Sequence, residues 1–211
     1  MQKKTHLAFG LFLASILFVL GASFEYVILI GFISFLPDID WLMDKLWFRN
    51  NSLFKQLWRK IFKSRPIHRT FLHNVWVMII LMILFGYFSN WNLLAISSVF
   101  VGYFSHLLMD SLTVAGVYWL WPYGDEKIFG KRKFYMNGNF VTGCLKEKAL
   151  CGAFIIFGGI LFGYGIYMRY ITHVDGGAYQ IFIIFLIILF GICLMRKFVK
   201  EISKATSRLF K

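Results

Sequence analysis

The sequence predicts an all-α, polytopic membrane protein: a helical bundle of about six spans with both termini in the cytoplasm, together with an interfacial amphipathic helix. Three observations predict this fold. First, the 211-residue chain is 59% hydrophobic and has a mean hydropathy of +0.66, more apolar than soluble proteins usually are. Second, apolar runs long enough to span a bilayer recur along the chain. Third, the basic residues lie between these runs as the positive-inside rule requires.

The first two apolar runs, residues 7–22 and 24–36, predict a helical hairpin because only a short Gly-Ala-Ser connection separates them. Each arm is near the lower length limit for a membrane span. Two lysines before the first run would also fit a signal peptide, with cleavage after the small residues at 21–23. We favour the hairpin because cleavage would discard His6, which belongs to the candidate site below.

The middle of the chain predicts an interfacial helix and two further spans. Residues 41–63 mix aromatic and aliphatic side chains with Lys and Arg, a pattern typical of one or two amphipathic helices lying on anionic headgroups. A third span is expected at residues 71–88, with Pro66 suited to its first turn. The fourth is expected at residues 93–112, after an Asn-Trp-Asn turn.

The last third of the chain begins with its longest polar connection, residues 113–147. Within it, Asn137-Gly138 lies between apolar neighbours, which indicates a hairpin turn. Residues 150–167 and 179–195 predict the last two spans, and a basic tail follows them.

The net charge of +13 suggests nucleic acid as a partner, but the placement of the charges argues against it. On the six-span topology every Lys and Arg except Arg169 lies on the cytoplasmic side. Positive-inside bias and contact with anionic membrane lipids account for such a distribution. We therefore expect no nucleic-acid partner.

Histidines and aspartates gather at the cytoplasmic ends of the first four predicted spans. The candidate metal ligands are His6 before span one, Asp38 and Asp40 after span two, His68 and His73 before span three, and His106 and Asp110 near the end of span four. A spacing of four residues puts the last two on one helix face. Ionisable groups on a membrane helix are costly and mark functional sites.

Each candidate ligand also has a simpler interpretation. Asp38 or Asp40 could cap the helix that follows. His6 could be an interfacial residue, and His68 could be a loop residue beside the headgroups. Asp110 could be protonated, or paired with a histidine without a metal. These interpretations leave unexplained why such residues gather at one end of four separate spans.

Imidazole and carboxylate ligands together suit zinc, manganese or iron. The three cysteines have no CxxC spacing, which argues against a closed thiolate site for zinc. Seven candidates exceed one tetrahedral shell, so we expect two divalent ions, zinc being the favoured metal, that share a carboxylate. His68 and His73 lie about 140° apart around a helix, so both point inward only if His68 precedes the regular helix.

The candidate ligands belong to a series of short motifs in a fixed order: Thr5-His6, Leu36-Pro37-Asp38-Ile39-Asp40, His68-Arg69-x-x-x-His73, Ser105-His106-x-x-x-Asp110-x-x-Thr113, Gly116 and Trp121-Pro122. These ordered motifs resemble the YdjM-like family of inner-membrane proteins, which are described as metal-dependent hydrolases. The resemblance covers residues 1–125. We therefore divide a single membrane-embedded domain, residues 1–211, into a metal-site region (1–125), a cytoplasmic loop (126–147), and two further spans with the tail (148–211).

That family is distantly similar to zinc-dependent phospholipase C and the P1-type nucleases, helical enzymes that cleave phosphodiesters with clustered metals. The resemblance implies that one metal is held by one Asp of the 38–40 pair, one His of the 68–73 pair, His106 and Asp110. It implies that His6 helps to hold a second metal, with Asp110 as the bridge. The sequence lacks the later His-x-x-x-Glu of those enzymes, so a third metal is not expected.

These observations predict a membrane-embedded hydrolase in the bacterial inner membrane, with its site facing the cytoplasm. Its substrate would be a lipid or another membrane-associated phosphoester, attacked by a metal-activated water. Asp38 or Asp40, whichever is not a ligand, is the candidate general base, and Arg69 is the candidate phosphate-binding residue.

Two other classes of function remain open. One is a non-catalytic membrane protein, either a metal-stabilised scaffold or a metal transporter. The other is a metal-free lipid phosphatase with a histidine nucleophile, which His106-x-x-x-Asp110 superficially resembles. The Pro-Ser-Gly-His motif expected of such a phosphatase is missing from the chain.

Overall fold

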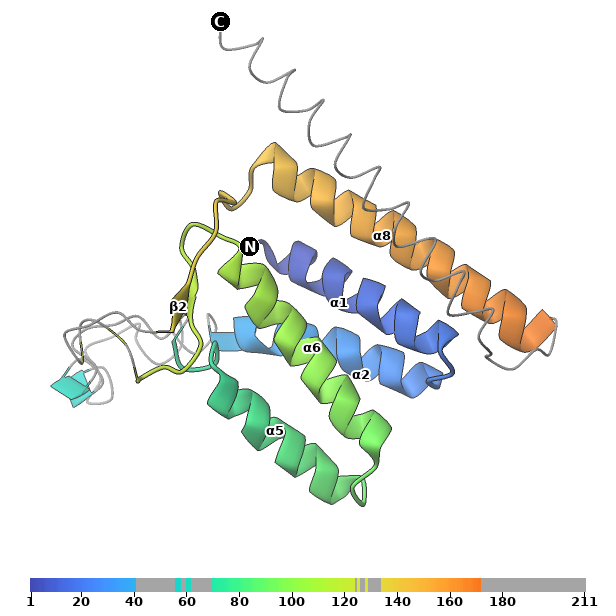
Figure 1. The fold of residues 1–211 in the computed structure, drawn as a ribbon, viewed down its shortest axis with the longest axis horizontal. Coiled ribbons are helices and arrows are strands. Elements are labelled where there is room, and N and C mark those ends of the chain that lie inside the picture. The colour runs from blue at the N-terminus through green and yellow to red at the C-terminus, as the bar shows by residue number, and fades with distance from the viewer. Residues whose placement is uncertain are drawn as a thin grey trace, which may run out of the picture.

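In the computed structural model, long α-helices pack side by side into a bundle (Figure 1). The structure describes residues 1–40, 56–57, 60–61, 70–123, 125, 128 and 134–171. The long helices of these residues are α1 (Lys3–Val19), α2 (Phe24–Phe35), α5 (Val75–Phe88), α6 (Leu93–Ser111) and α8 (Leu145–Ile166). A 3-10 helix, η1 (Leu36–Ile39), continues α2, and a short π-helix, η2 (Tyr167–Ile171), continues α8.

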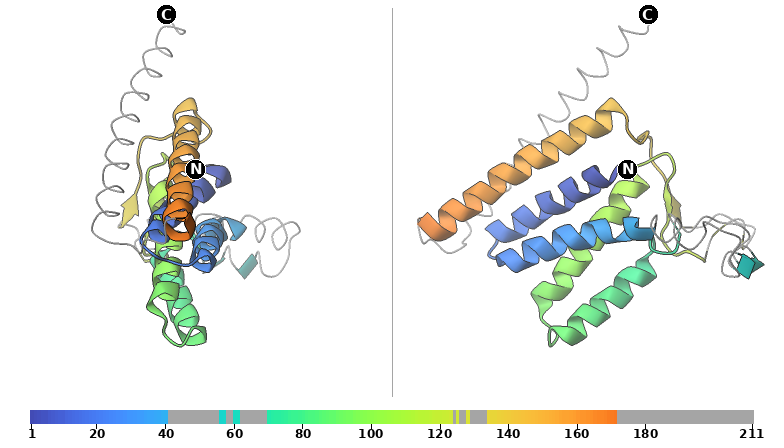
Figure 2. Two further views of the ribbon diagram at one scale, coloured as in Figure 1. Left: turned by 90° about the vertical axis from the view of Figure 1, so that its right-hand side faces the viewer. Right: turned by 180° about the vertical axis from the view of Figure 1, so that it is seen from behind.

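The bundle has α8 at one edge and α5 at the other, with α1 and α2 between them and α6 crossing the layer (Figure 2). Its core includes Ile33 of α2 and Val99, Tyr103 and Leu107 of α6, all of them fully buried. A Cβ at Gly102 would lie only 2.8 Å from the Ile30 carbonyl oxygen, so glycine is needed where α6 crosses α2. This crossing brings the end of α6 close to the end of α2.

The predicted N-terminal hairpin is confirmed, since α1 and α2 are joined by a short connection. Gly21 in this connection has a φ of 108°, a conformation that only glycine adopts readily. A Cβ at Gly10 would lie 2.3 Å from the Ser34 Oγ, so the two arms approach closely. The start of α1 therefore lies beside the end of α2.

The helix expected from residue 71 begins later, at Val75. Asn74 is its N-cap, and the Asn74 side chain accepts a hydrogen bond from the Val77 backbone N–H at 3.1 Å. Residues 70–74 instead form a turn that carries His73. The expected boundary was wrong because the asparagine cap decides where the helix begins.

α8 packs along α1, and Arg169 in the π-turn after α8 fastens the far end of α1. Its guanidinium donates hydrogen bonds to the carbonyl oxygens of Phe18 (3.2 Å) and Ala22 (3.1 Å) and lies 4.6 Å from the centroid of the Phe18 ring. Carbonyls at the end of a helix lack intrahelical partners, and a cation there is favourable. Arg169, the one basic residue that the predicted six-span topology puts outside the cytoplasm, thus contacts the end of α1 directly.

The connection between α6 and α8 contains a small antiparallel sheet, so the all-α prediction needs a minor correction. Strand β1 (Val117–Tyr118) pairs with β2 (Tyr135–Met136), with Val117 opposite Met136. Asn137-Gly138 follows β2 and does not join these two strands, so the expected hairpin turn was wrong. Gly138 lies so close to the Leu112 carbonyl oxygen that a Cβ there would be 2.3 Å from it. The segment therefore packs on the end of α6.

Two helices of the described part are long and apolar enough to cross a membrane, at Leu93–Ser111 and Leu145–Tyr170. The helices α1, α2 and α5 have 17, 12 and 14 residues. The sixth expected span, residues 179–195, lies outside the described residues, as does nearly all of the expected amphipathic helix at 41–63. Exposed apolar side chains such as Ile80 and Ile155 suit a helix surface that faces lipid.

Candidate metal centre

Six of the seven expected ligands lie together at one end of the bundle, where α1 begins and where η1 and α6 end. They are His6, Asp38, Asp40, His73, His106 and Asp110, and none of them is more than 4% exposed. The seventh, His68, and the expected phosphate-binding Arg69 lie outside the described residues. The convergence that the sequence predicts is therefore present for every described ligand.

Four side chains, here called the quartet, place one atom each around a common point: Asp38, His73, His106 and Asp110. The Nε2 atoms of His73 and His106 are 3.0 Å apart. Asp110 Oδ2 lies 3.3 Å from His73 Nε2 and 3.8 Å from His106 Nε2. Asp38 Oδ1 is 4.0 Å from both of these nitrogens. Ligands at about 2.0–2.1 Å from a tetrahedral zinc ion lie about 3.3 Å from one another, close to the spacing seen here.

The other nitrogen of each quartet imidazole has its own acceptor. His73 Nδ1 lies 2.9 Å from Asp40 Oδ2, and His106 Nδ1 lies 2.8 Å from the Ser34 carbonyl oxygen. A carbonyl only accepts, so Nδ1 of His106 carries the proton and Nε2 presents its lone pair. Metal-binding histidines almost always donate their second N–H to a carboxylate or a carbonyl. The quartet therefore has both the ligand atoms and the supporting hydrogen bonds of a metal site.

The protonation of His73 reflects the same arrangement. Burial disfavours its charged form, but hydrogen bonds to Asp110 and Asp40 outweigh burial and raise the pKa of His73 from 6.5 to about 9. Without a metal, the imidazolium of His73 neutralises part of the carboxylate charge around it. A metal cation would take over this role and displace the proton.

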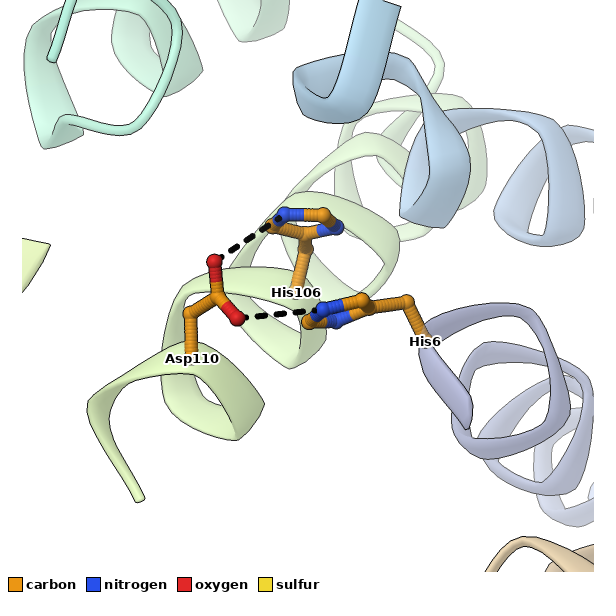
Figure 3. A group of neighbouring side chains, drawn as sticks. All are labelled: His6, His106 and Asp110. Atoms are coloured by element: carbon orange, nitrogen blue, oxygen red, sulfur yellow. Dashed lines mark ion pairs between the residues drawn. The ribbon is translucent and has the colours of Figure 1, made fainter. Parts of the chain in front are cut away.

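His6 approaches Asp110 from the opposite side. Its Nε2 is 3.1 Å from Asp110 Oδ1, and its ring stacks on that of His106 with centroids 3.9 Å apart and planes 17° apart (Figure 3). Among the described residues, no hydrogen-bond partner reaches His6 Nδ1. The terminal nitrogen of Met1 also contacts Asp110 Oδ1. Asp110 thus presents one oxygen to His6 and the other to the two histidines of the quartet.

Two overlapping groups could hold a metal ion: one is His6, His106 and Asp110, and the other is Asp38, His73 and His106. In each group the three ligand atoms lie within 4.8 Å of one another, and every residue is buried. His106 belongs to both groups, and Asp110 reaches both sides with separate oxygens. The donor set of imidazoles and carboxylates fits zinc, manganese or iron.

The turn before α5 holds His73 in place with several hydrogen bonds. Asn74 Nδ2 donates to the carbonyl oxygens of Thr70 (3.1 Å) and Phe71 (2.6 Å), and the Val75 N–H donates to the Trp119 carbonyl oxygen at 2.8 Å. The hydroxyl of Tyr103 on α6 donates to the carbonyl of Leu72, next to His73. His73 is therefore fixed from its own turn, from α6 and from the strand region.

The 3-10 helix η1 gives Asp38 and Asp40 different roles, which the sequence left open. A 3-10 helix has three residues per turn, so two side chains that are two positions apart point in different directions. Asp38 faces Nε2 of His73, and Asp40 faces Nδ1 of the same ring. The helix that either aspartate could cap would begin at residue 41, outside the described residues.

Sequence reasoning missed two contributors to the site. The Ser34 carbonyl that orients His106 is a backbone group, which no residue type reveals. Glu147 at the start of α8 contacts the start of α1, and nothing in its sequence neighbourhood indicates this contact. Both contributions depend on helix packing.

One protein family, described as YdjM inner membrane protein, has a model that matches residues 1–199 of the chain. The match extends the resemblance from residues 1–125 to nearly the whole chain. No curated protein and no solved structure matches the chain. The comparisons do not show the expected similarity to zinc-dependent phospholipase C and the P1-type nucleases.

Proposed function

We propose that this chain, a member of the YdjM inner membrane protein family, is a membrane-embedded, metal-dependent hydrolase of a phosphoester at the cytoplasmic leaflet. The quartet is the observation that carries the proposal. Its two Nε2 atoms are 3.0 Å apart, and its two carboxylate oxygens lie 3.3–4.0 Å from them. Both imidazoles also have hydrogen-bond acceptors at their Nδ1 atoms. A histidine pair that only stabilised a fold would not need this orientation.

The topology of the proposal comes from the basic residues. Six spans with both termini in the cytoplasm place the start of α1 and the ends of η1 and α6 on the inner side of the membrane. The site then lies at the level of phospholipid headgroups, and a phospholipid is the leading substrate class.

The quartet would hold one metal ion, and His6 with Asp110 would help to hold a second, zinc being the favoured metal. A divalent ion bound there supplies Lewis-acid polarisation of the phosphoester and lowers the pKa of water. The protein residues themselves hold the ion, orient its ligands and accept a proton. Asp110 has an oxygen for each side, so it suits the bridging position.

Neither aspartate is left over as a free base, because Asp38 belongs to the quartet and Asp40 is bound to His73 Nδ1. Asp38 is therefore proposed both as a ligand, through Oδ1, and as the general base, through Oδ2. Its Oδ1 faces the two imidazoles, whereas its Oδ2 is buried and, among the described residues, has no hydrogen-bond partner, so that oxygen can accept a proton. Asp40 is bound to His73 Nδ1 and orients that ring. Arg69 remains the proposed phosphate-binding residue on sequence grounds.

A second candidate function, a non-catalytic metal-stabilised scaffold, is favoured by the burial of the ligands. A structural metal site is closed and has four protein ligands, and the quartet offers four buried ones. A transporter is less favoured, because its ligands would lie near the middle of the bilayer and these lie at one end of the bundle. Catalysis therefore has to be measured separately from metal content.

The test uses the full chain purified in detergent, as wild type and as His106→Ala. His173→Ala is the control, because this fifth histidine follows the fifth predicted span and lies outside the predicted cytoplasmic group of ligands. Elemental analysis gives metal content, and hydrolysis of phospholipid vesicles and soluble phosphodiesters is followed with and without a chelator. We expect metal and chelator-sensitive hydrolysis in wild type and His173→Ala, and neither in His106→Ala. Metal without hydrolysis of any of these phosphoesters would favour the scaffold, and a wild type without metal would contradict both.

A further inference from the structure

Glu147 is a buried carboxylate that the proposed chemistry does not use. It lies in the first turn of α8 and is 1% exposed. Its Oε1 accepts hydrogen bonds from the Gln2 backbone N–H at 2.5 Å and from the Thr5 hydroxyl at 3.0 Å. Its Oε2 accepts one from the Gly143 N–H at 2.5 Å. Two of its three donors thus belong to the start of α1.

The start of α1 lacks a cap of its own. The first N–H groups of a helix have no intrahelical acceptors, and a negative charge nearby is favourable. The N-cap residue of α1, Gln2, makes no side-chain cap, and the first turn contains no acidic residue. Glu147 supplies both the acceptor and the charge from a position about 145 residues away. It is a cap provided by another helix.

This cap lies next to a candidate ligand. Thr5, which is bound to Glu147, immediately precedes His6, and each residue along a helix advances about 1.5 Å and turns about 100°. His6 reaches Asp110 Oδ1 at 3.1 Å only at one rotation and height of α1. A carboxylate that holds both Gln2 and Thr5 fixes that rotation and height at the end where His6 lies.

We propose that Glu147 is the positioning residue for His6: by capping α1 from α8, it holds the His6 imidazole against Asp110 and His106. The inference rests on the proposed function insofar as His6 helps to hold a metal. Glu147 acts through the backbone and Thr5 of α1, and touches none of the six described ligands in the hydrogen bonds above.

A double-mutant cycle in the purified full chain tests the metal part of the inference. Glu147→Ala should weaken binding of the zinc ion that His6 helps to hold by about 10–100-fold, the usual effect of removing a residue that orients a ligand. In a His6→Ala background the same change should alter the affinity for the remaining zinc by no more than about twofold, because the ligand that it positions is already gone. An equal loss in both backgrounds would show a general structural role and overturn the proposal.

Two further variants sharpen the cycle. Glu25→Ala is the matched control, since Glu25 is an exposed acid in the first turn of α2, remote from the site. The Glu25→Ala variant should bind zinc as tightly as wild type. Glu147→Gln keeps an oxygen that can accept from Gln2 and Thr5, so it should restore part of the lost affinity. If Glu147→Gln lowers zinc affinity as much as Glu147→Ala does, these hydrogen bonds do not have the proposed role.

Labelling with diethylpyrocarbonate, read by mass spectrometry, gives a measurement that needs no metal. His6 should be protected in wild type and Glu25→Ala and become labelled in Glu147→Ala, while His73 and His106 stay protected. If His6 stays protected in Glu147→Ala, or all three histidines become labelled together, the proposal is wrong. A wild type that binds no metal would refute the proposed function, and this labelling would still decide the role of Glu147.

Discussion

His73 and His6 reach the same carboxylate, Asp110, from opposite sides, but the chain holds them in different ways. His73 lies in a turn fixed by Asn74 immediately after it, with Asp40 on its second nitrogen. His6 lies on a helix whose start is fastened by Glu147, far away in sequence. The His73 side is therefore specified mostly by short motifs, and the His6 side by the packing of α8 on α1.

This difference predicts an order of affinity between the two sides. The His73 side contains four ligand atoms and two oriented imidazoles. The His6 side has one imidazole of its own and shares Asp110, because the single free ring nitrogen of His106 already belongs to the quartet. A preorganised set of ligands loses less conformational entropy on binding, so we expect the quartet to bind its metal more tightly.

The largest effect should come from Asp110→Asn, because Asp110 serves both sides. Asparagine keeps the size of the side chain but removes the charge, so metal at both positions and any hydrolysis should be lost. Elemental analysis and the vesicle assay measure this, with Glu25→Gln as the control for loss of an acid. Zinc or manganese retained at the wild-type level in Asp110→Asn would exclude the bridging role.

The next largest effect should separate the two sides. His6→Ala should lower the metal content to the ion held by the quartet. His73→Ala should remove that ion and weaken binding of the ion on the His6 side. Titration with zinc in a competing chelator gives both the number of ions and their affinities. Equal losses in the two variants would mean that the two sides form a single site.

Asp40→Asn should have a smaller effect, confined to the His73 side. Loss of the carboxylate behind His73 should reduce zinc affinity by about 10–100-fold, because that carboxylate fixes the orientation of the His73 ring and raises its basicity as a ligand. Asp38→Asn should cost more than Asp40→Asn, because Asp38 presents its oxygen to both quartet nitrogens. If Asp40→Asn proves the more damaging of the two, the roles assigned here are reversed.

The pH dependence of zinc binding should report on the same side. The pKa of His73 is about 9, so below that pH a proton must leave before a metal binds, and affinity should rise by about tenfold per pH unit. Affinity is thus expected to be low in acid and to level off near pH 9. Measurement between about pH 6 and pH 9 checks the slope, and Asp40→Asn should move the plateau to lower pH by removing a cause of the raised pKa.

The smallest effect should come from the helix caps, for which the chain offers a matched pair. Asn74 caps α5 beside His73, and Asn92 caps α6 at the opposite end of that helix from His106. Each Asn→Ala change should cost about 1 kcal/mol of stability, measured by thermal unfolding in detergent. Only Asn74→Ala should also weaken zinc binding. An equal effect of Asn92→Ala on zinc would show that metal affinity follows general stability.

Much of the fold and of the site could be predicted from the sequence. The runs of apolar residues predict helices, and they correctly place the α1–α2 hairpin and α6 to within a few residues. The spacing of His106 and Asp110 correctly predicts that both point toward one place. The start of α5 was misplaced, because the apolar pattern continues through the turn that carries His73. The small sheet was missed, because its strands have only two residues each.

By itself, the sequence determined which residues could bind a metal and at which helix ends they lie, because hydropathy and residue type are properties of the chain. Only the tertiary structure decided which aspartate faces which nitrogen of His73, that the Ser34 carbonyl orients His106, and that Glu147 caps α1. Those contacts depend on the rotation and height of one helix against another. Side-chain packing sets both, and no local pattern encodes them.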